Sequence, residues 1–181
     1  AILPEFALSG FSLDKRKTAF DISDLEFFKE LAIQNHCAVT FGAVLGDYNK
    51  SITLDKTGAP ISEYSKIHLF TFGSEDRVYK NGSAVSQFVV SEFSVLPFIC
   101  YDLRFAYLFW SQALNTDMYV VIANWPALRR RHWLTLLKAR AIENQAFVIG
   151  VNRIGESPTI KYCGDSIVVS PTGEELLNCG D

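Results

Sequence analysis

Short apolar runs alternate with polar segments along the whole chain, and the lengths of these runs predict both strands and helices. Continuous apolar runs of about four to eight residues are typical of strands that are buried on both faces. We predict such strands at residues 37–45, 87–90, 94–99, 118–123 and 147–152. Apolar residues at helical spacing predict helices over residues 21–34, 105–114 and 130–144. Ser23 or Asp24 is the expected N-cap of the first helix, because either side chain can accept from unpaired backbone N–H groups.

The remaining segments with strand character predict two β-hairpins. Residues 48–55 and 60–64 flank Gly58, which adopts the positive φ of a tight turn at little steric cost. Residues 166–169 and 175–177 form the second pair. Strands that alternate with helices and end in a hairpin predict an α/β protein whose buried strands are largely parallel.

Composition limits the classes of function. With 181 residues, of which 49% are hydrophobic, residues 1–181 are expected to form one domain. The net charge is −3 and no run of like charges is longer than the three arginines at 129–131, which argues against nucleic-acid binding and a polybasic membrane anchor. There is no apolar run of about 18 residues, no signal peptide and no C-x-x-C pair among the four cysteines. These features predict a cytoplasmic protein.

Polar side chains stand where three of the predicted strands end. Cys100, Asn124 and Asn152 each lie at or directly after the C-terminal end of an apolar run. Such strand ends can hold reactive side chains rigidly beside a crevice. Cys100 is therefore a candidate nucleophile, with Asp102 and Arg104 close by in the sequence. The alternative is that Cys100 is a buried structural cysteine, which is a common role for this residue type.

A nucleophilic cysteine needs a base or a positive field to become a thiolate. His36, His68 and His132 could each pair with Cys100, although none of them has a distinctive setting and a structural role suits each of them as well. No histidine and cysteine pair has the spacing of a promising metal site. We therefore expect no metal, and the residues alone leave the base undecided.

Three motifs in a fixed order resemble those of the nitrilase superfamily of carbon-nitrogen hydrolases. They are Leu3-Pro4-Glu5-Phe6 with Gly10-Phe11, then Tyr64-Ser65-Lys66-Ile67-His68-Leu69-Phe70, then Ile99-Cys100-Tyr101-Asp102-Leu103-Arg104-Phe105. The segments 140–145 and 164–166 are also similar, so the resemblance covers nearly the whole chain. Within the superfamily, Ala123-Asn124-Trp125-Pro126 and Leu69-Phe70-Thr71 look most like the omega-amidases, which act on 2-oxoglutaramate and similar amides.

The resemblance implies a four-layer αββα sandwich of the nitrilase type. The family has a strand and a helix before the first motif and a further strand after the point where this sequence stops. The connections at 45–47 and 91–93 are also shorter than the family pattern. We therefore expect residues 1–181 to be a single carbon-nitrogen hydrolase domain that is incomplete at both ends, as a fragment or as a chain with gaps. The resemblance further implies a homodimer or a larger homo-oligomer.

The resemblance also implies a catalytic triad of Glu5, Lys66 and Cys100. Cys100 would attack an amide carbonyl and form a thioester, and Glu5 would act as general base and acid. Lys66 and the backbone N–H of Tyr101 would stabilise the oxyanion. Glu75 looks like the second glutamate of the family, which orients the lysine. Its alternative is a solvated acid on a loop.

The expected substrate is a short amide whose far end carries a carboxylate. Arg104 would bind this carboxylate, Asn124 and Trp125 would contact the substrate, and Phe105 with Trp125 would exclude large acyl groups. Arg104 could instead form a structural ion pair with an acid such as Asp102. The arginines at 129–131 and 153 are further candidates, and the run 129–131 could equally be a solvated start of a helix.

Two other functions stay open at this point. The same nucleophile and oxyanion site could hydrolyse nitriles or N-carbamoyl compounds. A protein of the same fold could also have lost catalysis and act in binding, because fold does not determine function. No organic cofactor is expected for any of the hydrolytic reactions.

Overall fold

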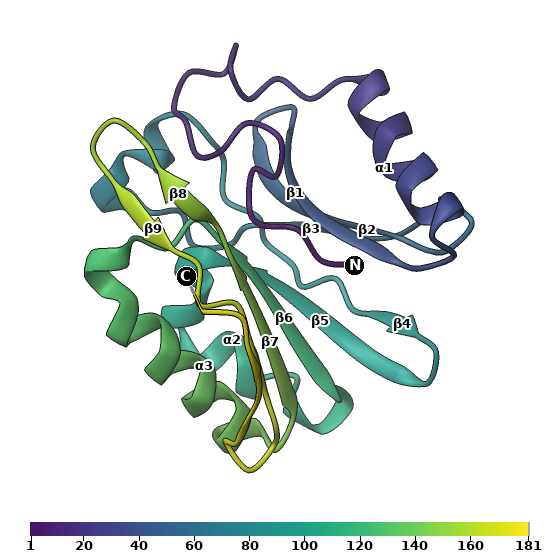
Figure 1. Cartoon of the computed structure of the whole chain (residues 1–181), viewed down its shortest axis with the longest axis vertical. Coiled ribbons are helices and arrows are strands. Elements are labelled where there is room, and N and C mark those ends of the chain that lie inside the picture. The colour runs from purple at the N-terminus through teal and green to yellow at the C-terminus, as the bar shows by residue number, and fades with distance from the viewer. Residues whose placement is uncertain (181) are drawn as a thin grey trace.

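The computed structural model describes residues 1–180, in which two large β-sheets pack face to face with helices on the outside (Figure 1). The first sheet is antiparallel, in the order β1 (Val39–Leu45), β2 (Tyr48–Leu54), β3 (Pro60–Ser65). The second sheet has the order β11-β10-β7-β6-β5-β4. Its strands are β4 (Phe88–Val90), β5 (Phe93–Ile99), β6 (Met118–Ala123), β7 (Phe147–Asn152), β10 (Ile167–Val169) and β11 (Glu175–Asn178).

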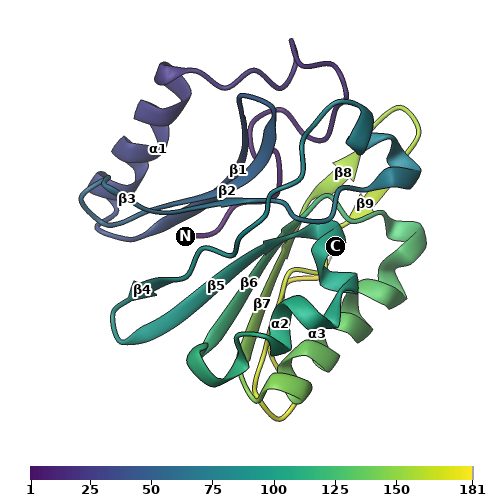
Figure 2. The same ribbon diagram turned by 180° about the vertical axis from the view of Figure 1, so that it is seen from behind.

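Helices cover the outer face of each sheet. Helix α1 (Ile22–Gln34) lies on the first sheet, while α2 (Ala106–Trp110) and α3 (Arg130–Asn144) lie on the second, as the reverse view shows most clearly (Figure 2). The layers therefore follow the expected order of helix, sheet, sheet, helix. None of the helices described for residues 1–180 is long and apolar enough to cross a membrane.

Helix α1 begins earlier than the cap predicted from the sequence. Its N-cap is Asp21, whose carboxylate accepts from the backbone N–H groups of Ser23 at 2.7 Å and Asp24 at 3.1 Å. Asp24 accepts in return from the Asp21 N–H at 3.0 Å, which completes a capping box. The prediction of Ser23 or Asp24 as the cap was wrong, because the reciprocal pair of aspartates satisfies backbone donors from both sides of the turn.

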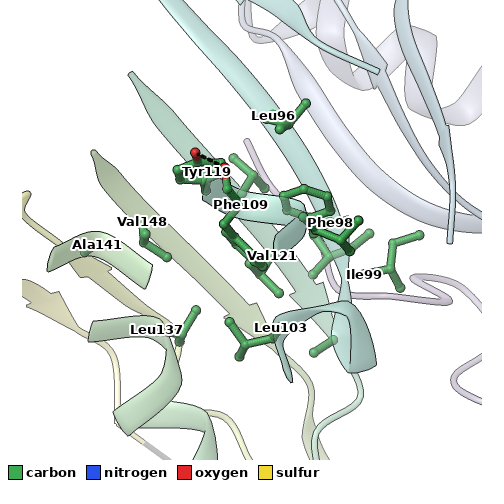
Figure 3. Close-up of a cluster of buried hydrophobic side chains, with 14 of the residues drawn as sticks. Leu96, Phe98, Ile99, Leu103, Phe109, Tyr119, Val121, Leu137, Ala141 and Val148 are labelled. Atoms are coloured by element: carbon green, nitrogen blue, oxygen red, sulfur yellow. Dashed lines mark hydrogen bonds between the residues drawn. The ribbon is translucent and has the colours of Figure 1, made fainter. Parts of the chain in front are cut away.

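The second sheet contains the main core. Strands β5, β6 and β7 are parallel, and β4, β10 and β11 pair antiparallel at the two sides, so the sheet is mixed rather than largely parallel. Figure 3 shows side chains of β5, β6 and β7 meeting those of α2 and α3. Phe98 and Val121 are completely buried, and each such side chain contributes about 1.5 to 3 kcal/mol on burial. This packing holds the C-terminal ends of the parallel strands at fixed positions.

Two further local predictions need correction. The helix predicted over 105–114 is only the five-residue α2, followed by a 3-10 turn at Ala113–Asn115. The hydroxyl of Ser111 bonds to the Leu108 carbonyl at 3.1 Å, and such local side-chain bonds compete with helix continuation. A hairpin of β8 (Ile154–Glu156) and β9 (Lys161–Cys163) was not predicted, because these strands are short and the first is fully exposed, so they carry no apolar pattern.

Candidate active site

A cavity of about 200 Å³ lies at the C-terminal ends of β5 and β6. Eight of the candidate side chains line this cavity, namely Glu5, Lys66, Cys100, Tyr101, Arg104, Asn124, Trp125 and Arg129. The lining also includes aromatic and apolar residues that the sequence did not single out as site residues, namely Phe11, Phe70, Pro126, Ile160 and Tyr162. The fold therefore brings segments more than a hundred residues apart into one small pocket with largely aromatic walls.

Cys100 stands on a strained turn directly after β5. It begins a 3-10 turn, Cys100–Arg104, with φ at 45°, which costs a residue other than glycine about 1 to 3 kcal/mol. The buried carboxylate of Asp102 holds this turn, since it accepts from the Ile99 N–H at 3.1 Å and the Tyr64 hydroxyl at 2.8 Å. The His68 N–H donates to the same carboxylate at 2.8 Å. Asp102 thus ties the turn that carries the thiol to the segment that carries Lys66.

None of the three histidines weighed as partners of Cys100 lines the cavity: His36 is exposed after α1, and the other two contact other groups. His68 Nδ1 lies 3.2 Å from Asp102, Nε2 lies 2.9 Å from the Tyr107 hydroxyl, and the ring stacks on Phe105 at 3.5 Å. His132 Nδ1 lies 3.0 Å from an Arg104 nitrogen. Phe105 therefore packs on His68 instead of lining the cavity, so the prediction that it limits the acyl group was wrong.

Glu5, Lys66 and Glu75 form a buried cluster behind Cys100. The Lys66 ammonium donates to Glu5 Oε1 at 2.8 Å and to the two Glu75 oxygens at 3.1 Å and 2.9 Å. All three side chains are 1% exposed or less. Glu75 is therefore not a solvated loop acid, because its carboxylate is enclosed and paired with the predicted lysine. We call these three residues the buried cluster.

Neutral donors complete the buried cluster. The side-chain amide of Asn49 donates to Glu5 Oε1 and to Glu75 Oε1, at 2.8 Å in each case. The Asn124 N–H donates to Glu5 Oε2 at 2.9 Å, and the Phe70 N–H donates to Glu75 Oε2 at 2.6 Å. Sequence reasoning missed Asn49. The one available signal was an asparagine within a predicted strand, where this residue type is uncommon.

The surroundings shift the pKa values of Glu5 and of the Cys100 thiol in opposite directions. Burial alone would raise the pKa of Glu5, but the Lys66 charge and the bonds from Lys66 and Asn49 bring it below its usual value. Burial would lower the pKa of Lys66, but the two carboxylates hold it well above normal. Burial and the Glu5 charge raise the pKa of the Cys100 thiol well above its usual value. The resting pair is therefore a neutral thiol beside a carboxylate, the pattern of a nucleophile and its general base.

Two arginines that line the cavity are not engaged by carboxylates within residues 1–180. The Arg104 guanidinium lies over the Trp125 ring at 5.0 Å and beside His132, and Arg129 lies over the Phe70 ring at 5.7 Å. The alternative of an ion pair between Arg104 and Asp102 is therefore wrong. By contrast, Arg130 pairs with the buried Asp165 at 2.6 Å, outside the cavity lining.

Arg153, the remaining arginine candidate, lies next to the cavity and is not part of its lining. Arg153 lies over the Tyr162 ring at 4.6 Å and bonds to the Glu156 carbonyl at 3.2 Å, so it supports the wall of the pocket. Across residues 1–180 no group of three or more histidine, cysteine, aspartate or glutamate side chains has the arrangement of a metal site.

Comparisons with known proteins show the family to which the chain belongs. A family model described as carbon-nitrogen hydrolase matches residues 1–181. The chain is 38% identical over 180 residues to the Omega-amidase YafV of Escherichia coli strain K12, covering 96% of this chain and 69% of that protein. It is 32% identical over 190 residues to the 2-oxoglutaramate amidase of Bacillus subtilis, covering 99% and 73%.

A solved structure is also similar over the whole fold. The crystal structure of XC1258 from Xanthomonas campestris, a CN-hydrolase superfamily protein with an arsenic adduct in its active site, superposes with a TM-score of 0.93. The sequences are 32% identical, and the match covers 99% of this chain and 73% of that one. The predicted resemblance and the predicted fold class are thereby confirmed.

Proposed function

The chain belongs to the carbon-nitrogen hydrolase family of the nitrilase superfamily, and we propose that it hydrolyses ω-amides of small dicarboxylic acids through a thioester on Cys100. Its relatives make it a hydrolase of amide carbon-nitrogen bonds. One observation carries the finer proposal: a single small cavity holds Cys100, the paired Glu5 and Lys66, and two arginines without a carboxylate partner among residues 1–180. The omega-amidase and 2-oxoglutaramate amidase relatives support the same substrate class.

Each residue type suits one step of such a reaction. Glu5 takes the thiol proton while Cys100 Sγ attacks the amide carbon, and the carbonyl oxygen becomes an oxyanion. The Lys66 charge and the Tyr101 N–H stabilise that oxyanion. Glu5 returns the proton to the amide nitrogen, the carbon-nitrogen bond breaks and ammonia leaves. Water then attacks the thioester, with Glu5 again accepting a proton, and the acid is released from the restored thiol.

The walls of the cavity suit a short acyl chain with an anionic end. The volume of about 200 Å³ leaves room for a small molecule. Arg104 and Arg129 supply charge-assisted donors for the distal carboxylate, and Trp125 packs along the chain of the substrate. Asn124, whose N–H and side chain both face Glu5, positions the base beside the amide.

The first test is replacement of the nucleophile. Cys100→Ala should lower turnover by at least about a thousandfold, because no other group can form the acyl intermediate. Cys163→Ala is the matched control, since Cys163 is also a half-buried free cysteine but lies outside the cavity. Thermal unfolding of both variants checks that they fold. Normal turnover by Cys100→Ala, or equal loss in Cys163→Ala, would contradict the thioester mechanism.

The second test concerns the carboxylate. Release of ammonia from 2-oxoglutaramate or succinamate should exceed that from an uncharged amide of equal length by about ten- to a hundredfold in kcat/KM, the worth of one desolvated contact to a charged group. Arg104→Met should remove most of this preference, whereas Arg131→Met, an exposed arginine outside the cavity, should leave it unchanged. Nitriles and N-carbamoyl compounds assayed in parallel test the alternative hydrolytic functions.

Two further expectations belong to the same proposal. The reaction needs no metal or organic cofactor, because Lys66 and backbone donors supply the charge stabilisation. Exhaustive chelation should therefore leave the rate unchanged, and a loss restored by one metal would contradict this expectation. We also propose that the chain assembles as a homodimer or larger homo-oligomer, which sedimentation would measure directly.

A further inference from the structure

The buried cluster holds two carboxylates but only one ammonium group. Lys66 donates one hydrogen bond to Glu5 and two to Glu75, which accounts for all three of its N–H donors. Two ionised carboxylates beside one cation leave a net negative charge in a site that is closed to solvent. Like charges that share a buried site favour protonation of one of them. Another donor must therefore offset the second carboxylate if Glu5 is to remain a base.

Besides the backbone N–H groups of Asn124 and Phe70, Asn49 on strand β2 supplies such a donor, and it is the one side-chain amide that reaches both carboxylates among the described residues. Its side chain is completely buried, and Nδ2 lies 2.8 Å from Glu5 Oε1 and 2.8 Å from Glu75 Oε1. A primary amide has two N–H donors, so each carboxylate receives one. Each Oε1 atom thereby accepts from both Lys66 and Asn49. Asn49 does not line the cavity, so its contacts are with the cluster and not with the substrate.

The orientation of the amide is determined by its surroundings. Asn49 Oδ1 is buried and has no hydrogen-bond partner among residues 1–180, which costs free energy. Rotation of the amide by 180° would point Oδ1 at two carboxylate oxygens and would remove both donors. The two bonds from Nδ2 therefore outweigh the unpaired acceptor.

We propose that Asn49 is a positioning residue of the hydrolase, which keeps the Glu5 carboxylate ionised and fixed against Lys66 by donating one hydrogen bond to each glutamate. This inference rests on the proposed role of Glu5 as general base. The hydrogen bond from Asn49 is among the interactions that lower the pKa of Glu5. Asn49 acts through Glu5 and touches neither the thiol nor the substrate.

The test uses two variants and a control on the same strand. Asn49→Leu keeps the approximate shape of the side chain and removes both donors, while Asn49→Ser is smaller and easier to accommodate. Ser51→Ala is the matched control, because Ser51 is buried on the same face of β2 and its hydroxyl has no partner among the described residues. The measurements are kcat and KM across the acid limb of the pH profile, with thermal unfolding as the check on folding.

A positioning role gives a distinct combination of results. In both Asn49 variants kcat should fall by about ten- to a hundredfold, because the base is misplaced. KM should stay within about threefold of wild type, because the contacts that bind the substrate are unchanged. The acid limb of kcat/KM should move up by about one pH unit, the worth of one lost bond to a charged carboxylate. Ser51→Ala should show none of these changes.

The outcomes separate this inference from the function on which it rests. A folded Asn49→Leu with wild-type kcat and an unmoved acid limb would overturn the inference, and so would failure of both variants to fold, which would assign Asn49 to the stability of β2. Glu5→Gln is measured alongside. If Glu5→Gln is inactive while the Asn49 variants are normal, only the role of Asn49 is wrong. If Glu5→Gln is itself active, the proposed mechanism is wrong.

Discussion

The chain contains two clusters of three charged groups with nearly the same geometry in opposite environments. In the buried cluster, Lys66 lies 2.8 Å and 2.9 Å from oxygens of Glu5 and Glu75, all three being 1% exposed or less. In what we call the surface cluster, Asp47 lies 2.7 Å and 2.8 Å from Lys15 and Lys80, with side chains 41 to 65% exposed. The first places two acids around one base, and the second places two bases around one acid.

The comparison shows that solvent, rather than distance, decides what such a cluster can do. Water screens and solvates the surface cluster, so its excess positive charge needs no further protein partner. The buried cluster has no such help, and the protein surrounds it with neutral donors from Asn49, Asn124 and Phe70. A buried arrangement of this kind can hold a carboxylate beside a neutral thiol, which is what acid-base chemistry requires.

The strongest way to break the comparison is to remove the cation from the buried cluster. Lys66→Met should abolish hydrolysis and lower the free energy of unfolding by about 3 to 5 kcal/mol, because two carboxylates are left buried without their counter-charge. Denaturant titration and an ammonia-release assay measure the two effects. If Lys66→Met still hydrolyses the substrate, or keeps the wild-type free energy of unfolding, the neutral donors alone are enough to hold the carboxylates.

Lowering the pH is a weaker way to perturb both clusters, because it protonates their carboxylates. The pKa of Glu5 is lowered in the folded protein, so its contribution to stability is present above its usual value of 4.5 and is lost as the pH falls through the lower folded value. Asp47 behaves in the same direction, with a pKa lowered from 3.8 to about 2 by bonds from Lys15 and Lys80. Unfolding followed from pH 5 downward should lose less stability in Glu5→Gln than in wild type.

Salt distinguishes the two carboxylates in that experiment. The contribution of Asp47, measured as the difference between Asp47→Asn and wild type, should shrink at about 1 M salt, where the Debye length is about 3 Å. The contribution of Glu5 should change little, because the buried pair excludes the screening ions. Equal salt dependence of the two would show that solvent reaches the buried cluster.

The smallest expected effect comes from the surface cluster. Lys80→Met should leave the unfolding midpoint within the scatter of repeat measurements and should not affect hydrolysis, since Asp47 keeps its bond to Lys15 and remains solvated. This variant is also the matched control for Lys66→Met, because the same residue type is changed in each. A large loss of stability in Lys80→Met would remove the distinction between the two clusters.

The sequence by itself determined the scaffold of the site. Runs such as 118–123 are apolar at every position, so they predict buried strands whatever surrounds them, and the same pattern locates the strand ends at Cys100 and Asn124. The motifs around Glu5, Lys66 and Cys100 carried the family and its fold, and the comparisons confirm both. The hairpin of β8 and β9 escaped prediction because both strands are short and β8 has no buried face, so they leave no apolar pattern.

Tertiary structure alone decided which polar groups meet. Asn49 lies 44 residues from Glu5 and 26 from Glu75, yet one amide bonds to both, and nothing local in the sequence encodes that contact. The sequence could not show either that Arg104 does not pair with Asp102. Residues that are close in sequence can point to different partners once the turn has formed. Burial and hydrogen-bond partners set proton affinity, and both depend on elements folded together across the whole chain. The sequence therefore supplies the reactive groups, while packing of the two sheets sets their charge states and directions.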